Sequence, residues 1–113
     1  MNSYYYTTLD DTIISVSMKA ILDSNLLSMS GGSVLYELRI NEEVADSHEH
    51  KARPKPGSMF AILEQDSRKR SIRVDVSPGI FKVKYKLTVD DAEVALNKIS
   101  ESELKGLWHK RKI

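Results

Sequence analysis

The sequence predicts an all-β protein, an antiparallel β-sandwich of about eight strands followed by a short C-terminal helix. Three observations favour this fold class. Apolar and polar residues alternate with a period of two along most of the chain, as they do in half-buried strands. Turns that are polar or contain glycine separate the alternating segments. Residues 100–112 instead have the spacing of an amphipathic helix.

Length and composition indicate one domain without specialised chemistry. A chain of 113 residues with a formal net charge of +1 has room for one core and creates no global field that would attract nucleic acid or a membrane. The absence of cysteine excludes disulfides, thiolate nucleophiles and cysteine-based zinc sites. No apolar run is long enough for a membrane span, and no secretory signal is recognisable at the start. We therefore expect a single cytoplasmic domain, residues 1–113, without a cofactor.

The first half of the chain predicts a lead-in followed by alternating strands. Residues 1–11 lack a period and are predicted to be a loose lead-in, in which Tyr4-Tyr5-Tyr6 covers an open edge of the core or, alternatively, stacks on a ligand. From Thr12, one strand face carries Ile14, Val16, Met18, Ala20 and Leu22, and the other carries Ser15, Ser17 and Lys19. Residues 26–29 suggest a short strand, and residues 34–40 and 44–47 suggest a hairpin with its turn at 41–43.

Pro54, Pro56 and Gly57 interrupt this pattern and predict a connector, residues 51–57, between half one (12–50) and half two (58–98). A long surface loop within one sheet is the alternative. The second half begins with residues 60–63, which are apolar on both faces and predict a central strand. Further along, the inward faces carry Ile72, Val74 and Val76, and then Phe81, Val83, Tyr85, Leu87 and Val89.

The two halves share a pattern. Tyr36-Glu37-Leu38-Arg39-Ile40 is matched by Tyr85-Lys86-Leu87-Thr88-Val89, and each segment precedes a polar turn and a short apolar return. Chance similarity between two hairpins is the alternative explanation. If the repeat is real, each half is a four-strand meander, and the two pack together as a sandwich.

This pattern resembles the β-sandwich of the Fas apoptotic inhibitory molecule family over residues 33–96. The similarity lies in Phe60, residues 72–74, residues 79–81, residues 85–90 and, more faintly, residues 36–41. The resemblance implies a protein-binding module without an active site. Glu42 and Asp91 stand where a hairpin glycine is expected, so the turn type differs from that pattern.

The candidate binding residues are mostly basic. If Val76 opposes Phe81, Asp75 meets Lys82 and Arg73 meets Lys84, which leaves a repulsive pair on the outer face. The candidates for binding an acidic partner are Arg68, Lys69, Arg70, Arg73, Lys82, Lys84 and Lys86. The alternative is a solvated face on which lysine only prevents aggregation.

His48-Glu49-His50 would place two imidazoles on one strand face, a spacing compatible with two metal ligands. A third ligand is missing, so we favour a solvated loop and predict no metal site.

The sequence contains no nucleophile elbow, phosphate loop, dinucleotide fingerprint or zinc-protease motif, and we therefore predict that the protein is not an enzyme.

The C-terminal segment predicts a capped helix over residues 100–112. Ser100 and Glu103 have the spacing of a capping box, and Leu104, Leu107 and Trp108 share one helix face. Trp108 is interpreted as a plug at one end of the sandwich or, alternatively, as a residue that docks on a partner.

The preferred function is a non-catalytic protein-interaction module that uses a strand edge or the basic face, with a homodimer through a strand edge as one form. The alternative is a binder of nucleic acid or another polyanion through residues 68–70, the lysine strand and residues 110–112. A small-ligand carrier would instead need a deep polar pocket between the sheets.

Overall fold

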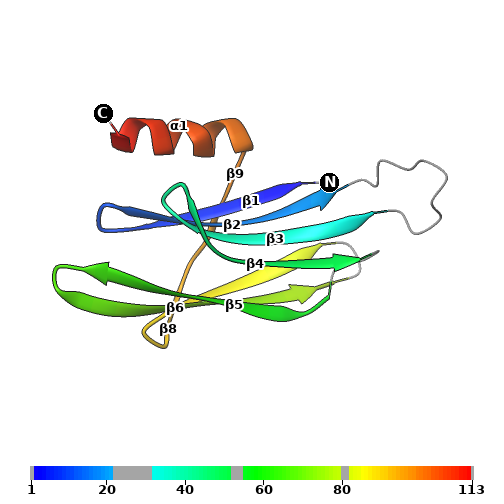
Figure 1. Cartoon of the computed structure of the whole chain (residues 1–113), viewed down its shortest axis with the longest axis horizontal. Helices are drawn as coiled ribbons and strands as arrows, with labels where there is room; N and C mark the ends of the chain where they lie inside the picture. The colour runs from blue at the N-terminus through cyan, green and yellow to red at the C-terminus, as the bar shows by residue number, and fades with distance from the viewer. Residues whose placement is uncertain (1, 22–31, 52–54, 80–81, 113) are drawn as a thin grey trace.

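Two antiparallel sheets pack face to face in the computed structural model of the protein, and a helix lies on the outer side of one sheet (Figure 1). The structure describes residues 2–21, 32–51, 55–79 and 82–112. The first sheet has the order β4-β3-β2-β1-β9 and the second has the order β5-β6-β7-β8. The elements are β1 (Ser3–Leu9), β2 (Thr12–Ile21), β3 (Ser33–Ile40), β4 (Glu43–Lys51), β5 (Gly57–Gln65), β6 (Arg68–Pro78), β7 (Val83–Val89), β8 (Ala92–Val94), β9 (Asn97–Ile99) and α1 (Glu101–Lys112). The predicted β-sandwich with a C-terminal helix is confirmed.

Each sheet contains one four-strand meander, because β1 to β4 and β5 to β8 are neighbours in chain order. β9 then returns to the first sheet and pairs with β1, with Tyr4 opposite Ile99. The matching segments at Tyr36 and Tyr85 lie on β3 and β7, the third strand of each meander, and their rings meet edge to face with centroids 6.4 Å apart. The internal repeat itself stays a prediction.

The core lies between the sheets and is built from the inward residues of alternating strands. β2 and β3 contribute Ile14, Val16, Tyr36 and Leu38, and the second sheet contributes Met59, Ile72, Val74, Val76, Leu87 and Val89. All of them are buried, as the period of two predicts for β2, β3, β6 and β7. The predicted strand at 26–29 and the inward position of Phe81 lie outside the described residues.

The prediction that residues 1–11 form a loose lead-in is wrong, because β1 is fully paired with β2 from Ser3 to Leu9. Tyr4 lies on the outer face and is buried beneath α1, whereas Thr7 is buried on the inner face opposite Ile14. Both faces of β1 are therefore covered, so its sequence shows no alternation of apolar with polar residues.

The central position predicted for residues 60–63 is also wrong. β5 is an edge strand, and the side chains of Phe60 and Ile62 are 55% and 65% exposed on the outer face of its sheet. Ala61 and Leu63 pack against the core as expected. The apolar pattern on both faces of β5 thus reflects one core face and one exposed apolar face.

Four two-residue turns close the hairpins β1–β2, β3–β4, β5–β6 and β7–β8, and all four lie at the same end of the sandwich (Figure 1). None contains glycine. In the β7–β8 turn, Asp90 has φ 50° and Asp91 has φ 68°, and in the β5–β6 turn Asp66 and Ser67 have φ 49° and 66°. Two consecutive left-handed residues give the twist that such hairpins need, and Asp tolerates this region better than most residues.

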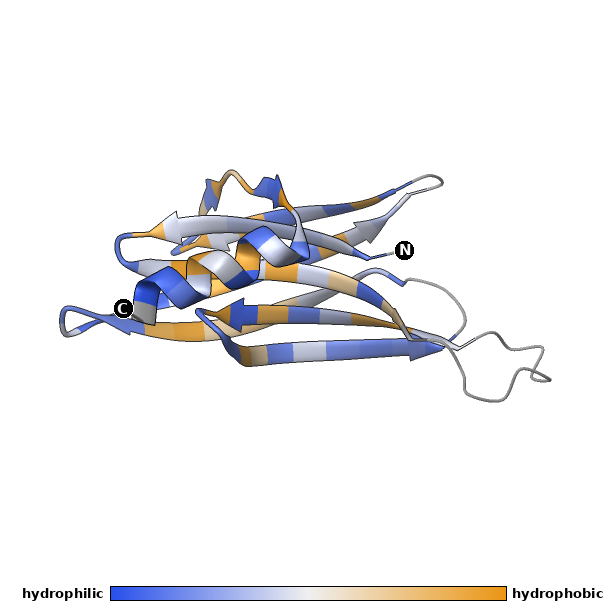
Figure 2. Ribbon diagram, turned by 90° about the horizontal axis from the view of Figure 1, so that it is seen from above, coloured by the Kyte–Doolittle hydropathy of each residue, from blue (hydrophilic) through white to orange (hydrophobic). Residues whose placement is uncertain are grey.

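Ser100 caps α1 as predicted, but the Glu103 carboxylate bonds the Ser100 hydroxyl rather than the Ser100 amide that a full capping box requires. The amide of Glu103 donates to the Ser100 hydroxyl at 3.2 Å, and that hydroxyl donates to the Glu103 carboxylate at 2.8 Å. The predicted place of the helix, however, is wrong. α1 lies along the outer face of the five-stranded sheet rather than at an end, and Figure 2 looks directly down on it. The reason is that Leu104 packs in one cluster with Tyr4 and Ile13, whose side chains point outward from β1 and β2.

Replacing Asp91 with glycine should stabilise the fold by about 1 kcal/mol, because glycine adopts positive φ without a steric cost. Asp91→Val should destabilise it, since β-branched residues fit this region poorly. Asp90→Gly is the matched control. Unlike Asp91→Gly, it removes the hydrogen bond from the Ser71 amide (2.9 Å) and the ion pair with Arg70, so it should not gain stability. Urea denaturation measures all three, and a less stable Asp91→Gly variant would contradict the turn geometry.

Tyr36→Phe should leave the free energy of unfolding unchanged or raise it by up to about 1 kcal/mol. Tyr36 is 1% exposed, and its buried hydroxyl has no hydrogen-bond partner among the described residues. Burial raises the pKa of this hydroxyl. By contrast, Leu38→Ala on the same strand should cost about 2–5 kcal/mol because it leaves a core cavity. Denaturant midpoints of the two variants test this difference.

Candidate functional site

The outer face of the four-stranded sheet carries several of the predicted binding residues. Strand alternation places Lys69 and Arg73 of β6 on this face together with Lys84 and Lys86 of β7, and Lys82 directly precedes β7. We call Lys82, Lys84 and Lys86 the lysine row. All three are exposed, and none forms an ion pair with another described residue.

Phe60 and Ile62 form an apolar pair on the same face, at the β5 edge. The guanidinium carbon of Arg73 lies 5.6 Å from the centroid of the Phe60 ring, a cation–π arrangement. The backbone amide of Phe60 points away from β6 and donates to the Asp46 carboxylate of β4 at 2.9 Å. The surface therefore combines an exposed apolar pair with the Arg73 guanidinium. The Phe60 amide, on the open edge of β5, is already hydrogen-bonded.

Asp75 lies between the apolar pair and the lysine row. Its carboxylate accepts bonds from the Ser58 hydroxyl at 2.6 Å and from Arg73 Nε at 2.9 Å. These contacts, the Ser58 bond first, hold the pKa of Asp75 below its usual value. Arg73 and Asp75 thus neutralise each other, and the net positive charge lies on the lysine row.

The predicted register of β6 and β7 is wrong. Val76 faces Tyr85 rather than Phe81, so Asp75 meets Lys86 and Arg73 meets Thr88. The repulsive opposition of Arg73 and Lys84 does not occur. β6 runs on to Pro78, and beyond it the Gly79 amide donates to the Lys82 carbonyl at 2.8 Å. A slip by an even number of residues keeps every side chain on its face, so alternation cannot detect it.

Three predicted residues do not join this surface. Strand alternation places Arg68 and Arg70 opposite Gln65 and Leu63, on the other side of β6 from Arg73. Arg70 Nε lies 3.0 Å from the Asp90 carboxylate, whose pKa is lowered by the Ser71 amide and by Arg70. Trp108 lies on α1, which covers the other sheet. The basic face thus retains Lys69, Arg73 and the lysine row.

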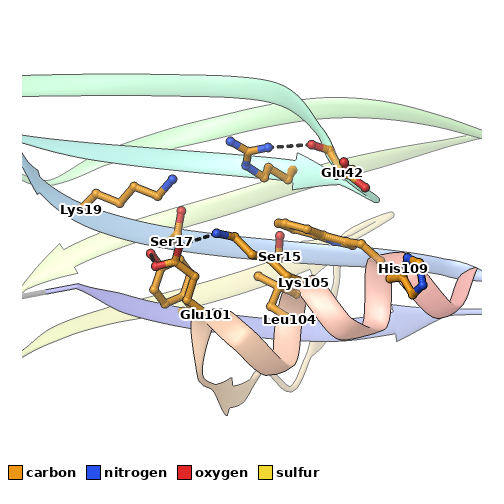
Figure 3. A pocket seen from close by; sticks show the side chains of 11 residues that line it. Ser15, Ser17, Lys19, Glu42, Glu101, Leu104, Lys105 and His109 are labelled. Carbon is orange, nitrogen blue, oxygen red and sulfur yellow. Dashed lines mark hydrogen bonds and ion pairs between the residues drawn. The ribbon is translucent and has the colours of Figure 1, made fainter. Parts of the chain in front are cut away.

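A second candidate site, which the sequence did not reveal, is a groove of about 460 Å³ between α1 and the outer face of the five-stranded sheet (Figure 3). Its lining includes Ser15 and Ser17 of β2, which are 2% and 4% exposed. Tyr4, Leu104 and Trp108 also line it. The alternation of β2 had placed both serines opposite the core face, but nothing in the strand pattern indicated that a helix would cover them.

Charged residues from three elements surround this groove. Lys19 Nζ lies 3.0 Å from one oxygen of Glu37, and Arg39 Nη2 lies 3.1 Å from the other. Glu37 is 7% exposed, so one buried carboxylate serves two cations. Arg39 also donates to the Glu42 carbonyl at 2.6 Å, and its guanidinium lies 5.7 Å from the Trp108 ring centroid.

Glu101 connects the first turn of α1 to β1. It accepts a bond from the Tyr4 hydroxyl at 2.6 Å and pairs with Lys105 Nζ at 2.8 Å. Burial and the Glu101 carboxylate raise the pKa of Tyr4 to about 12, and Lys105 and Tyr4 lower the pKa of Glu101. Tyr4 therefore keeps its proton and acts as a donor at neutral pH.

A smaller cavity of about 230 Å³ is lined by Tyr36, Met59 and Val76 together with His48 and His50 of β4. The two histidines belong to β4 rather than to the predicted loop, and the His50 ring meets the Tyr36 ring edge to face at 5.9 Å. No group of three or more His, Cys, Asp or Glu side chains suited to a metal ion occurs among the described residues.

The chain matches no protein-family model, no curated protein and no solved structure. The resemblance to the Fas apoptotic inhibitory molecule family therefore stays a prediction. Within the described parts of the chain, no helix is long and apolar enough to cross a membrane.

Asp75→Asn should reduce the loss of stability that acid causes. Because the folded pKa of Asp75 is lowered, its contribution is present above the unfolded value of about 3.9 and disappears as pH falls through the folded pKa. The variant should be less stable than the wild type near neutral pH and closer to it in strong acid. Urea unfolding across this pH range tests the sign, and a constant difference between the two proteins would refute the coupling.

Proposed function

We propose that the protein is a non-catalytic protein-interaction module that binds an acidic protein segment with an apolar anchor on the outer face of the four-stranded sheet. One observation carries this proposal. Phe60 and Ile62 are more than half exposed on a sheet face that no described element covers, and the same face carries a lysine row that forms no ion pair with a described residue. A face adapted only to solvation would not expose two large apolar side chains together.

The spacing of the two features describes the partner. The apolar pair on β5 and the lysine row on β7 are separated by one strand, β6, and so by about 10 Å at the usual strand spacing. Phe60 is in register with Arg73 and Thr88, and Lys86 and Lys84 follow two and four residues along β7. A partner segment that inserts an apolar side chain beside Phe60 would therefore place acidic groups about 12 and 17 Å away, opposite Lys86 and Lys84. Burying one such anchor contributes about 1.5–3 kcal/mol, and the charges would set orientation and association rate.

The alternative of a nucleic-acid surface is less well supported. Arg68 and Arg70 point away from the lysine row, and the tight turns at their end of the sandwich carry Asp66, Asp90 and Asp91. The basic end of α1 likewise lies near an acidic turn, because Arg111 Nε donates to the Asp11 carbonyl at 3.2 Å. These carboxylates oppose the continuous positive surface that a polyanion requires.

A homodimer through a strand edge is the other form of the interaction hypothesis, and β5 is the edge strand that carries the apolar pair. The Asp46 carboxylate occupies the Phe60 amide, and an inward-pointing charge at a sheet edge disfavours the addition of another strand. We therefore assign the interaction to the face of the sheet rather than to its edge.

The proposal predicts that a partner captured by the wild type is lost by the double variant Phe60→Ser, Ile62→Ser and by Lys84→Glu, Lys86→Glu. Binding of the purified partner, measured by calorimetry, should weaken at least about tenfold in each, that is by about 1.4 kcal/mol or more. Val44→Ser is the matched control, because Val44 is 47% exposed on β4 of the other sheet, and it should bind normally.

Three results would overturn the proposal. Equal capture by wild type and both double variants would remove this face from the interaction. Concentration-dependent self-association that disappears in Phe60→Ser, Ile62→Ser would assign the face to a second copy of the chain instead. A partner that binds only through nucleic acid would be released by nuclease and by moderate salt.

A further inference from the structure

The groove beneath α1 has no part in the proposed interaction, yet its floor is unusual for a helix that only seals a sheet. α1 packs its apolar side against Tyr4 and Ile13, near one side of the five-stranded sheet. Beside that contact, β2 presents Ser15 and Ser17, and the groove remains open above them. A purely structural contact would be expected to place apolar side chains there and to leave no cavity.

Cationic side chains from three separate elements line this groove. Lys19 comes from β2, Arg39 from β3 and Lys105 from α1. Figure 3 shows Lys19 of β2 and Lys105 of α1 in the lining of this groove together with Ser17. The Ser17 hydroxyl and the two ammonium groups are hydrogen-bond donors that can bind an anionic group.

Three carboxylates lie near these three cations, so the groove has no excess of positive charge, but the contacts between them are shared. Glu37 is shared by Lys19 and Arg39, and Glu101 is shared by Lys105 and the Tyr4 hydroxyl. Glu42 also lines the groove, on the turn after β3. The Lys105–Glu101 pair has side chains that are 64% and 47% exposed, and such pairs contribute little to stability. Lys105 can therefore exchange this partner for a ligand at small cost.

We propose that this groove binds a small organic anion, a carboxylate or phosphate monoester attached to an aromatic or apolar body. The anionic oxygens accept bonds from Lys19, Ser17 and Lys105, and the body lies against Leu104 and Trp108. A cavity of about 460 Å³ is within the range of sites for small molecules, and it combines an apolar wall with a few convergent polar groups.

The single tryptophan of the chain makes the groove directly observable. ¹⁵N-labelled full-length protein gives one indole N–H signal, from Trp108, which is followed by NMR during titration with phenyl phosphate and with benzoate. Benzyl alcohol supplies the same ring without charge, and inorganic phosphate supplies the charge without a ring. We expect a saturable shift with at least one aromatic anion below about 10 mM, and at least tenfold weaker binding of both single-feature compounds.

Two substitutions and one matched control locate the site. Lys19→Gln and Lys105→Gln should each weaken binding of the aromatic anion, and together by at least about tenfold. Glu37 retains Arg39 in the first variant, so the fold should be preserved. Lys84→Gln, on the opposite sheet, removes the same charge from the molecule and should not change the affinity.

The proposal fails if neither aromatic anion produces a saturable shift of the Trp108 signal. It also fails if benzyl alcohol or inorganic phosphate binds as tightly as the aromatic anions, because binding would then not require both the aromatic ring and the negative charge. Equal weakening by Lys84→Gln and Lys105→Gln would show that only net charge matters, and would likewise overturn it. None of these outcomes depends on whether the opposite sheet binds a protein.

Discussion

A sheet with apolar side chains on both faces must be covered on both sides, and the five-stranded sheet meets this requirement through the pairing of β9 with β1. That pairing directs the chain back over the sheet and places Leu104 against Tyr4 and Ile13. The hydrogen bond from Tyr4 to Glu101 and the cap at Ser100 then fix where the helix begins. The four-stranded sheet receives no such cover from the described residues.

This difference divides the molecule into two chemically distinct sides. On one side, the helix creates a groove in which ion pairs are partly buried and side chains are held in place. On the other, apolar and basic side chains of β5 and β7 remain exposed on a rigid strand framework. Strands hold side chains at regular spacing, so both surfaces are preorganised and neither needs a loop to order on binding.

The sequence predicted the features that depend on local periodicity. It did not predict the features that depend on which element packs against a strand in the folded protein. Alternation identified the core faces of β2, β3, β6 and β7, and the spacing of Ser100 and Glu103 identified the helix cap. The strand β1 was not predicted because side chains on both of its faces are buried. β5 was predicted to be a central strand because an apolar residue such as Phe60 is expected to be buried, whereas Phe60 is exposed. The lysine row was found as a feature of one strand. The groove was not predicted, because its residues come from β1, β2, β3 and α1 and meet only in three dimensions.

The pairing of β1 with β9 also determines when the protein can finish folding as it is made. Tyr4 and Ile13 leave the ribosome early, whereas Leu104, their buried partner, follows about ninety residues later. Until then the first meander has an unpaired strand edge at β1 and an uncovered aromatic face. A ribosome that pauses within the second meander would prolong this exposed state, so translation speed over residues 55–99 bears on how much of the chain aggregates before it is complete.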